Sequence, residues 1–291
     1  MKSGMNLRGE SNFAVLKTPR PVQFDSLGFS RWLAALPVWV LPLAIAMLML
    51  WPGMVHAQSF YSPQKVFGIL LKWMPLLVTK GFVLNILISF FTMLIGTIAG
   101  VFLGLGRVSH RLYVRRISWF LVQLFRNSPW LVLLFIVMLT LPFEIEIGGF
   151  IIPVPDWMKA VFGLSLPIMA NIAEIVRGAI RSVPDGQWEA SQALAFSRGQ
   201  VMRQIILPQC FKRMIPPWMN WYAILTMATP LVSLLGVTEL VTMSRQAMEA
   251  ENNHPSLLVP FYGFALIIFF AYSYPIARLT IALEKRFAVK L

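Results

Sequence analysis

Long apolar runs separated by short polar stretches make up most of this chain of 291 residues. Six of the runs reach the roughly 20 mostly apolar residues that a membrane-spanning helix needs. They cover residues 32–51, 81–106, 117–141, 157–177, 217–238 and 257–282. The pattern therefore predicts an all-α polytopic membrane protein with about six transmembrane helices.

The fourth and fifth runs are interrupted by prolines and polar residues. Pro167 lies within the fourth run, and Glu174 and Arg177 lie near its end. The fifth run contains Thr229 and Pro230. Breaks of this kind are tolerated at membrane depth only where other protein or a water-filled cavity satisfies them. We expect both spans to face the interior of the protein.

Composition supports the membrane class and excludes several others. The chain is 57% hydrophobic and 13% charged, with a mean hydropathy of +0.69, whereas soluble domains carry about 25% charged residues. Its single cysteine, Cys210, rules out a disulfide framework within the chain. The three histidines are far apart and share no ligand spacing, so the sequence does not support a metal site.

The net charge of +13 is unevenly distributed. Basic residues cluster in the N-terminal segment, in 107–116, in 177–213 and at the C-terminus, while two of the remaining loops are acidic. Alternation of this kind follows the positive-inside rule and argues for membrane lipid, not nucleic acid, as the partner of the positive charge. It predicts that both termini and the 177–213 loop are cytoplasmic, which an even number of spans also requires.

The N-terminal region divides into three parts. We interpret residues 1–31 as a polar, mostly disordered cytoplasmic tail, 32–51 as an extra N-terminal helix and 52–79 as a periplasmic segment. Val55-His56-Ala57-Gln58 is similar to a signal-peptidase site. Retention of the helix is favoured, because a 31-residue charged region would be unusually long for a signal peptide. Cleavage would leave five spans with an external N-terminus.

Three glycines in the second span, Gly96, Gly100 and Gly104, recur every four residues. This spacing places them on one helix face and allows another helix to approach closely. Packing against the chain's own helices is the favoured interpretation, and a subunit interface is the alternative.

The third run contains Arg126-Asn127-Ser128-Pro129. An arginine at the centre of a membrane helix costs roughly 2.5–3.5 kcal/mol. Arg126 and Pro129 are therefore candidates for the transport path or gate, although pairing or snorkelling of Arg126 is the simpler explanation. Pro129 breaks the helical ladder, and the polar residues before it could satisfy the freed backbone groups.

A polar loop follows the fourth span. Ser182 and Asp185 are suitable helix N-caps, and Ser197 followed by Gln200 has capping-box spacing. The loop is therefore expected to form two short helices that meet near 196–199. An amphipathic helix lying on the bilayer, to which Trp188 is suited, is the alternative.

This loop resembles the EAA loop of ABC-importer permeases. Glu189, Ala190 and Ile205-x-Leu207-Pro208 are in register with that motif, while Ser191 replaces its second Ala and Ala195 replaces its Gly. We call residues 182–213 the EAA segment. Because Ala adopts a positive φ less readily than Gly, we expect a slightly different turn at Ala195.

Three more stretches are similar to the polar amino acid branch of these permeases, which includes histidine, glutamine, glutamate/aspartate, arginine and opine importers. They are 173–190, with Glu174-x-x-Arg177-Gly, then 125–132, with Phe-Arg-x-x-Pro, and 229–240. The resemblance covers about 75–290 and implies a type I importer fold in which 80–291 is the permease domain and 32–51 is additional.

The resemblance also implies a function. The chain would form the translocation path for a polar amino acid delivered by a periplasmic binding protein, in the bacterial inner membrane. It would assemble with a second permease subunit and with a pair of ABC ATPase subunits. The residues expected to couple it to the ATPase are Gly186, Glu189, Ala190, Ser191, Ala195, Ile205, Leu207 and Pro208.

Catalysis is not expected in this chain. It lacks the G-x-x-x-x-G-K-[ST] sequence that holds nucleotide phosphates, so ATP and Mg would be bound by the partner ATPase and no cofactor by this chain. The candidate pathway or gate residues are Arg126, Pro129, Glu174, Arg177, Thr229 and Ser233. An ion-coupled carrier working without an ATPase is the alternative. The amino acid carried, and whether the permease pairs with itself or with a sister subunit, stay open.

Overall fold

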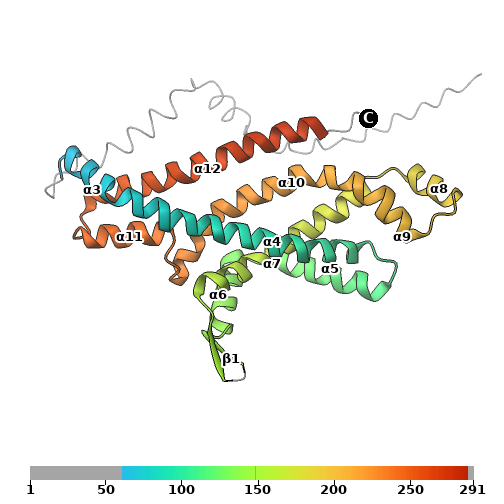
Figure 1. Ribbon diagram of the computed structural model, residues 1–291, viewed down its shortest axis with the longest axis horizontal. Coiled ribbons are helices and arrows are strands. Elements are labelled where there is room, and N and C mark those ends of the chain that lie inside the picture. The colour runs from blue at the N-terminus through green and yellow to red at the C-terminus, as the bar shows by residue number, and fades with distance from the viewer. Residues whose placement is uncertain (1–60, 148, 288–291) are drawn as a thin grey trace, which may run out of the picture. The chain divides into compact units, whose positions relative to one another are not determined.

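The computed structural model describes residues 61–147 and 149–287. The expected tail 1–31, the expected span 32–51 and the possible cleavage site lie outside these residues. The described chain is almost entirely helical, in agreement with the all-α prediction, and only one short hairpin departs from it. Figure 1 shows α4, α7, α10 and α12 running alongside one another, with the hairpin projecting away from them.

The centre of the fold is the pair formed by α4 (Val83–Arg107) and α7 (Asp156–Arg181). The glycine face of α4 lies directly on α7. A Cβ built on Gly100 would lie 2.7 Å from the Cβ of Ile172, and one on Gly104 would lie 2.6 Å from the Cβ of Val176. Only glycine permits this approach, so the predicted close packing is internal to the chain, as the sequence favoured.

Helix α4 is preceded by a helix that the sequence did not predict. Helix α3 (Pro63–Leu76) is capped by the Ser62 hydroxyl and continues through a π-helical segment, Leu77–Phe82, into α4. Most of the described part of the expected periplasmic segment 52–79 is therefore helical. The π-helical segment follows Pro75, whose ring removes a backbone donor from the ladder.

The third apolar run is interrupted near Pro129, as predicted, and the interruption is a sharp bend. The run forms α5 (Leu112–Arg126) and α6 (Trp130–Thr140), which are bent by 103° at residues 127–129. Pro129 stands at the N-terminal boundary of α6, where its missing N–H costs nothing. Asn127 Nδ2 donates to the Gln123 carbonyl at 2.8 Å and Ser128 Oγ to the Leu124 carbonyl at 2.6 Å. The expectation that polar residues before Pro129 bond to the backbone is confirmed for Asn127 and Ser128, whereas Arg126 makes no such side-chain bond within the described residues.

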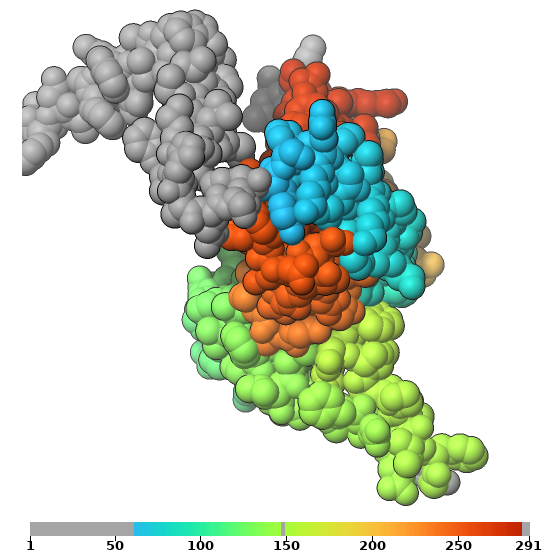
Figure 2. Space-filling model, turned by 90° about the vertical axis from the view of Figure 1, so that its left-hand side faces the viewer, coloured from blue at the N-terminus to red at the C-terminus, as the bar shows by residue number. Residues whose placement is uncertain are grey.

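An antiparallel hairpin joins α6 to α7. Strands β1 (Glu144–Ile147) and β2 (Phe150–Pro153) pair Glu144 with Pro153 and Ile147 with Phe150. Gly149 in the turn has φ +84°, a left-handed conformation that glycine adopts without strain. The hairpin protrudes from the described helices in Figure 2.

The fifth apolar run also differs from its predicted extent of 217–238. Helix α10 (Leu207–Ala228) begins ten residues earlier and passes into a 3-10 turn, Thr229–Leu235. Gly236 then takes φ +85°, and α11 (Leu240–Ala250) starts at an angle of 48° to the preceding helical segment. The predicted range 217–238 therefore contains the second half of α10 and the 3-10 turn, and α11 follows beyond it.

The last element is α12 (Leu258–Phe287), which follows a 3-10 turn at Pro255–Leu257. Three helical stretches of the described chain are long and apolar enough to cross a membrane, and five if each bent pair counts as one span. Five agrees with the predicted permease core. Two apolar clusters hold these elements together. One lies between α4, α6, α7 and α10, and the second lies between the π-helical segment Leu77–Phe82, α11 and α12.

Candidate functional site

The EAA segment forms two short helices, as predicted. Helix α8 spans Asp185–Ala193, and α9 spans Arg198–Gln200 before a π-helical turn, Val201–Ile206, that leads into α10. A capping box closes the start of α9. The Ser197 amide donates to Gln200 Oε1 at 2.8 Å, and the Gln200 amide donates to Ser197 Oγ at 3.4 Å. The spacing read from the sequence therefore identified the boundary between the helices.

The predicted caps of α8 are wrong. Pro184 occupies the N-cap position, and no side chain caps this end. Ser182 instead ends α7, where its hydroxyl donates to the Ala179 carbonyl at 2.8 Å. Asp185 is the first helical residue, so its carboxylate, and not that of Glu189 one turn later, lies where the helix dipole favours negative charge.

Ala195 takes the left-handed conformation that the family's glycine would adopt easily. Its φ is +57°, and its amide donates to the Gln192 carbonyl at 2.9 Å. The next amide, of Phe196, donates to the Ser191 carbonyl at 3.1 Å. These two bonds are the Schellman pattern that ends helices, with a residue at the position that usually holds Gly. The turn is thus retained with Ala in place, at the cost of backbone strain.

Helix α8 has two distinct faces. One is exposed and combines small with polar residues, and the single large apolar side chain of Leu194 lies beside it, 72% exposed. The exposed positions are Asp185, Gly186, Glu189, Ala190, Gln192, Ala193 and Leu194. On the opposite face Ser191 is buried, and its hydroxyl donates to the Gln187 carbonyl, while Trp188 packs against the main apolar cluster. The exposed face is thin and contains two carboxylates, those of Asp185 and Glu189.

The EAA segment is fastened to the helices on either side of it. Arg213 Nη1, on α10, donates to both the carbonyl and the hydroxyl of Ser182 at 2.6 and 2.7 Å. Gln209 Nε2 donates to Gln187 Oε1 on α8 at 2.7 Å. Of the remaining predicted coupling residues, Ile205 and Leu207 are half-buried and Pro208, in the first turn of α10, is exposed. Helix α10 is thus hydrogen-bonded both to the end of α7 and to α8.

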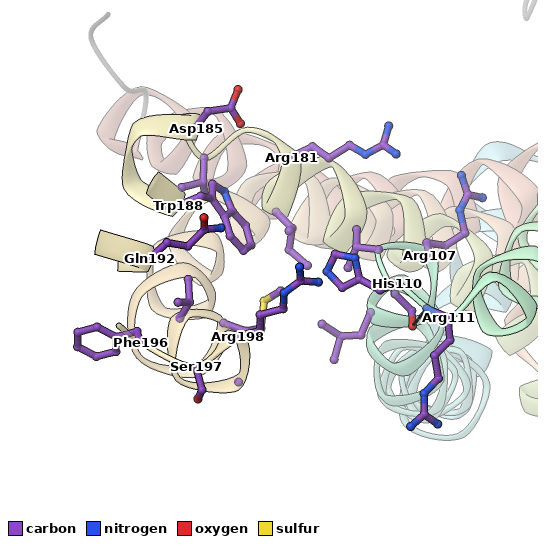
Figure 3. Close-up of a pocket in the computed structure, with 18 of the residues that line it drawn as sticks. Arg107, His110, Arg111, Arg181, Asp185, Trp188, Gln192, Phe196, Ser197 and Arg198 are labelled. Carbon is purple, nitrogen blue, oxygen red and sulfur yellow. Dashed lines mark hydrogen bonds between the residues drawn. The ribbon is translucent and has the colours of Figure 1, made fainter. Parts of the chain in front are cut away.

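A groove of about 1160 Å³ separates the EAA segment from the loop between α4 and α5. Figure 3 shows Arg198 extending from the EAA segment toward His110 on the facing loop. The polar and aromatic lining residues include Arg107, His110, Arg111, Arg115, Arg181, Asp185, Trp188, Phe196 and Arg198. The groove is strongly basic, with five arginines and one aspartate.

Glu174 joins α7 to α4 close to this groove. Its carboxylate lies 2.8 Å from Arg177 Nε, as the i, i+3 spacing predicted, and 2.9 Å from Arg107 Nη1. The side chains of Glu174 and Arg107 are only 14% and 11% exposed. The Arg107 partner was missed because 67 positions separate it from Glu174 in sequence.

A buried polar network near the break between α10 and α11 was also missed. Asn85 Nδ2 donates to Thr229 Oγ1 at 2.9 Å and to Glu239 Oε2 at 3.0 Å, while its carbonyl oxygen accepts from the Leu240 amide. Glu239 also accepts from the amides of Val241 and Thr242, and so caps α11. The sequence assigned Glu239 to an acidic loop. The available signal was Asn85, a polar residue within an apolar run.

The candidate pathway residues occupy three places. Arg126 and Pro129 lie exposed at the α5–α6 bend, Glu174 and Arg177 form their ion pair near the end of α7, and Thr229 and Ser233 lie in the 3-10 turn. Thr229 also donates to the Thr226 carbonyl, the backbone bonding that the sequence allowed as an alternative to lining a path. Among the described residues, no hydrogen bond or ion pair joins the three places.

Comparison with known proteins identifies the family. The family described as "Binding-protein-dependent transport system inner membrane component" matches residues 93–286. The chain belongs to this family. It is a multi-pass membrane component of a transport system, not an enzyme.

Individual relatives agree with this assignment. The chain is 35% identical to the "Probable amino-acid ABC transporter permease protein YckA" of Bacillus subtilis (strain 168), over 72% of this chain and 89% of the relative. It is 29% identical to the "Histidine/lysine/arginine/ornithine transport system permease protein HisM" of Escherichia coli (strain K12), over 74% and 92%. A solved structure, "Crystal structure of an amino acid ABC transporter with histidines", matches with a TM-score of 0.63 at 22% identity, over 75% of this chain and 96% of that chain. The structural likeness shows a common fold, that of type I ABC-importer permeases.

Proposed function

We propose that this chain forms the translocation path for a polar amino acid in an ATP-driven importer of the bacterial inner membrane. A periplasmic binding protein would deliver the solute, a second permease subunit would complete the path, and two ABC ATPase subunits would supply the energy. The amino-acid transport named for its relatives supports the solute class. The distribution of basic residues supports a cytoplasmic position for the EAA segment.

The geometry of the EAA segment is the observation that carries the coupling proposal. A narrow helix that exposes small residues fits into a groove on another protein without steric conflict. Leu194 offers an apolar anchor beside the Glu189 carboxylate. The other face of α8 is packed and hydrogen-bonded to the membrane helices. Force applied to the exposed face would therefore move α10 together with α8.

The mechanism requires two states of the complex. ATP binding draws the ATPase subunits together, and the EAA segment moves with them. The membrane helices then change from inward-open to outward-open, provided that ATP binds the complex more tightly in one state than in the other. The Arg213–Ser182 and Gln209–Gln187 bonds would keep α7, α8 and α10 moving as one body.

Reconstitution of the complex in liposomes tests the proposal. Glu189→Lys and Ala190→Trp change the exposed face, and Glu284→Lys makes the same charge reversal on α12, outside the EAA segment. We expect ATP-driven amino acid uptake to fall at least tenfold in the first two variants while the protein still reaches the membrane. The control should transport normally.

Normal uptake by both EAA variants would contradict the coupling role. Uptake by the wild-type chain in liposomes without ATP or an ATPase would contradict the importer altogether and indicate a self-sufficient carrier.

A further inference from the structure

A small basic cleft lies beside the groove of the EAA segment, on the side of α5. It has a volume of about 200 Å³ and is lined by Arg107, Arg115, Arg116, Arg181 and Trp119. These residues come from three helices, α4, α5 and α7. Four of the five are cationic, none is acidic, and the fifth is an aromatic side chain that is 52% exposed.

The positive charge of the cleft is largely uncompensated. Glu174 pairs with Arg107 but is shared with Arg177. Within residues 61–147 and 149–287, no carboxylate lies within 4.0 Å of the charged groups of Arg115, Arg116 or Arg181. The first turn of α5 contains no acidic residue. Like charges held close together repel one another, and an anion between them removes this cost.

Exposed apolar side chains lie on α5, the helix that provides three of the five residues lining the cleft. Ile117 lies two positions before Trp119 and Phe120 directly after it, and their exposed fractions are 61% and 58%. Tryptophan is enriched where a membrane meets water, because its ring is apolar and its N–H is polar. The guanidinium group of an arginine can bind two phosphate oxygens at once through parallel N–H···O bonds. An arginine cleft that opens beside exposed apolar side chains matches a phosphate carried on a lipid, with the acyl chains lying along α5.

We propose that this cleft binds the headgroup phosphate of an anionic phospholipid. Its volume of about 200 Å³ equals that of roughly seven water molecules at about 30 Å³ each, which is enough for one phosphate group with part of its headgroup. The bound phosphate joins the end of α4, the first half of α5 and the end of α7. Because α7 leads directly into the EAA segment, the lipid stabilises the base from which that segment projects. The inference does not depend on the proposed amino acid transport.

Native mass spectrometry of the full-length chain in mild detergent tests the site. The probes are dioctanoyl phosphatidylglycerol, dioctanoyl phosphatidylcholine and inorganic phosphate. Each juxtamembrane arginine contributes about fivefold to the affinity for an anionic lipid surface. We therefore expect Arg115→Gln/Arg116→Gln to weaken phosphatidylglycerol binding by about 25-fold. Lys285→Gln/Arg286→Gln, which removes the same charge from the end of α12, should change it less than twofold.

Arg181→Gln provides a second variant on a different helix, with an expected loss of about fivefold, in case the double variant does not fold. Equal affinity for the two lipids, or equal losses in the cleft and control variants, would overturn the proposal. Binding of inorganic phosphate that phosphatidylglycerol does not displace would overturn the lipid assignment in favour of a soluble anion. Unchanged lipid binding with loss of the co-purified ATPase would identify the cleft as a contact for an acidic protein segment.

Discussion

The strain at Ala195 makes a quantitative prediction about the EAA segment. With φ at +57°, its Cβ approaches the backbone in a way that costs an L-residue roughly 1–2 kcal/mol. Ala195→Gly removes this cost but adds about 0.5–1 kcal/mol, because glycine loses more conformational freedom on folding. The substitution should stabilise the end of α8 by about 0.5–1 kcal/mol.

Amide hydrogen exchange measures this local stability directly, because local opening sets the exchange rate of surface segments. The Leu194 and Phe196 amides donate to the Ala190 and Ser191 carbonyls when the turn is closed. After correction for intrinsic rates, their exchange should slow about two- to fivefold in Ala195→Gly. Amino acid transport should be retained, because the backbone of the turn is unchanged.

Two further variants decide whether the backbone conformation is the cause. Ala193→Gly alters a neighbouring exposed residue that is helical, where glycine costs about 1 kcal/mol, so the same amides should exchange faster. Ala195→Val places a β-branched residue in the left-handed region and should also speed exchange. Faster exchange in Ala195→Gly, matching Ala193→Gly, would refute the left-handed turn.

Three other predictions concern the stability of the purified chain. Gly100→Ala should lower it by about 1–3 kcal/mol, because the new Cβ would lie 2.8 Å from a carbonyl oxygen of α7. Gly263→Ala in α12, with nothing within 4 Å of the new Cβ, should instead raise it by up to about 1 kcal/mol, and thermal unfolding of the two variants checks this. Glu174→Gln should destabilise the chain by about 2–4 kcal/mol, because two mostly buried arginines, Arg107 and Arg177, lose the carboxylate they share. Glu249→Gln, in an exposed ion pair, should cost under about 1 kcal/mol. Equal melting temperatures of the two variants would contradict this prediction. Hydrogen bonds from Lys72 and Trp73 of α3 hold the pKa of Glu251 below its ordinary value, so the stability that Glu251 contributes is complete above about pH 4.3 and is lost as the pH falls through the lowered pKa. The difference in melting temperature between wild type and Glu251→Gln should therefore shrink as the pH falls through that range. A difference that stays constant would argue against the assignment.

The parts of the fold that could be read from the sequence are those determined by local pattern. The lengths of the apolar runs placed one or both ends of four of the five core spans close to where the structure has them. The glycine spacing in α4 indicated the face by which it contacts another helix. The capping box at Ser197 is a local motif as well, and it appears where the spacing placed it.

The features that the sequence analysis missed depend on contacts between distant segments. Hydropathy averages over a window, so it joined α5 to α6 across a 103° bend and did not show that Glu239 is buried and bonded to Asn85. Asn85 meets Glu239 across 154 positions, and Arg107 meets Glu174 across 67, separations that no local pattern encodes. The left-handed turn at Ala195 was not predicted, because alanine adopts a positive φ only with strain and its sequence neighbours do not require it.

The most direct test of the central claim is the recovery of partners with the tagged chain from its native membrane. The account predicts that an ABC ATPase subunit co-purifies with the wild-type chain and is lost when residues 185–208 are deleted or when Glu189→Lys is introduced, while Glu284→Lys retains it. Identification of the other recovered proteins would show whether a sister permease is present. Recovery of the chain without any ATPase, together with amino acid uptake in liposomes that lack ATP, would contradict the account.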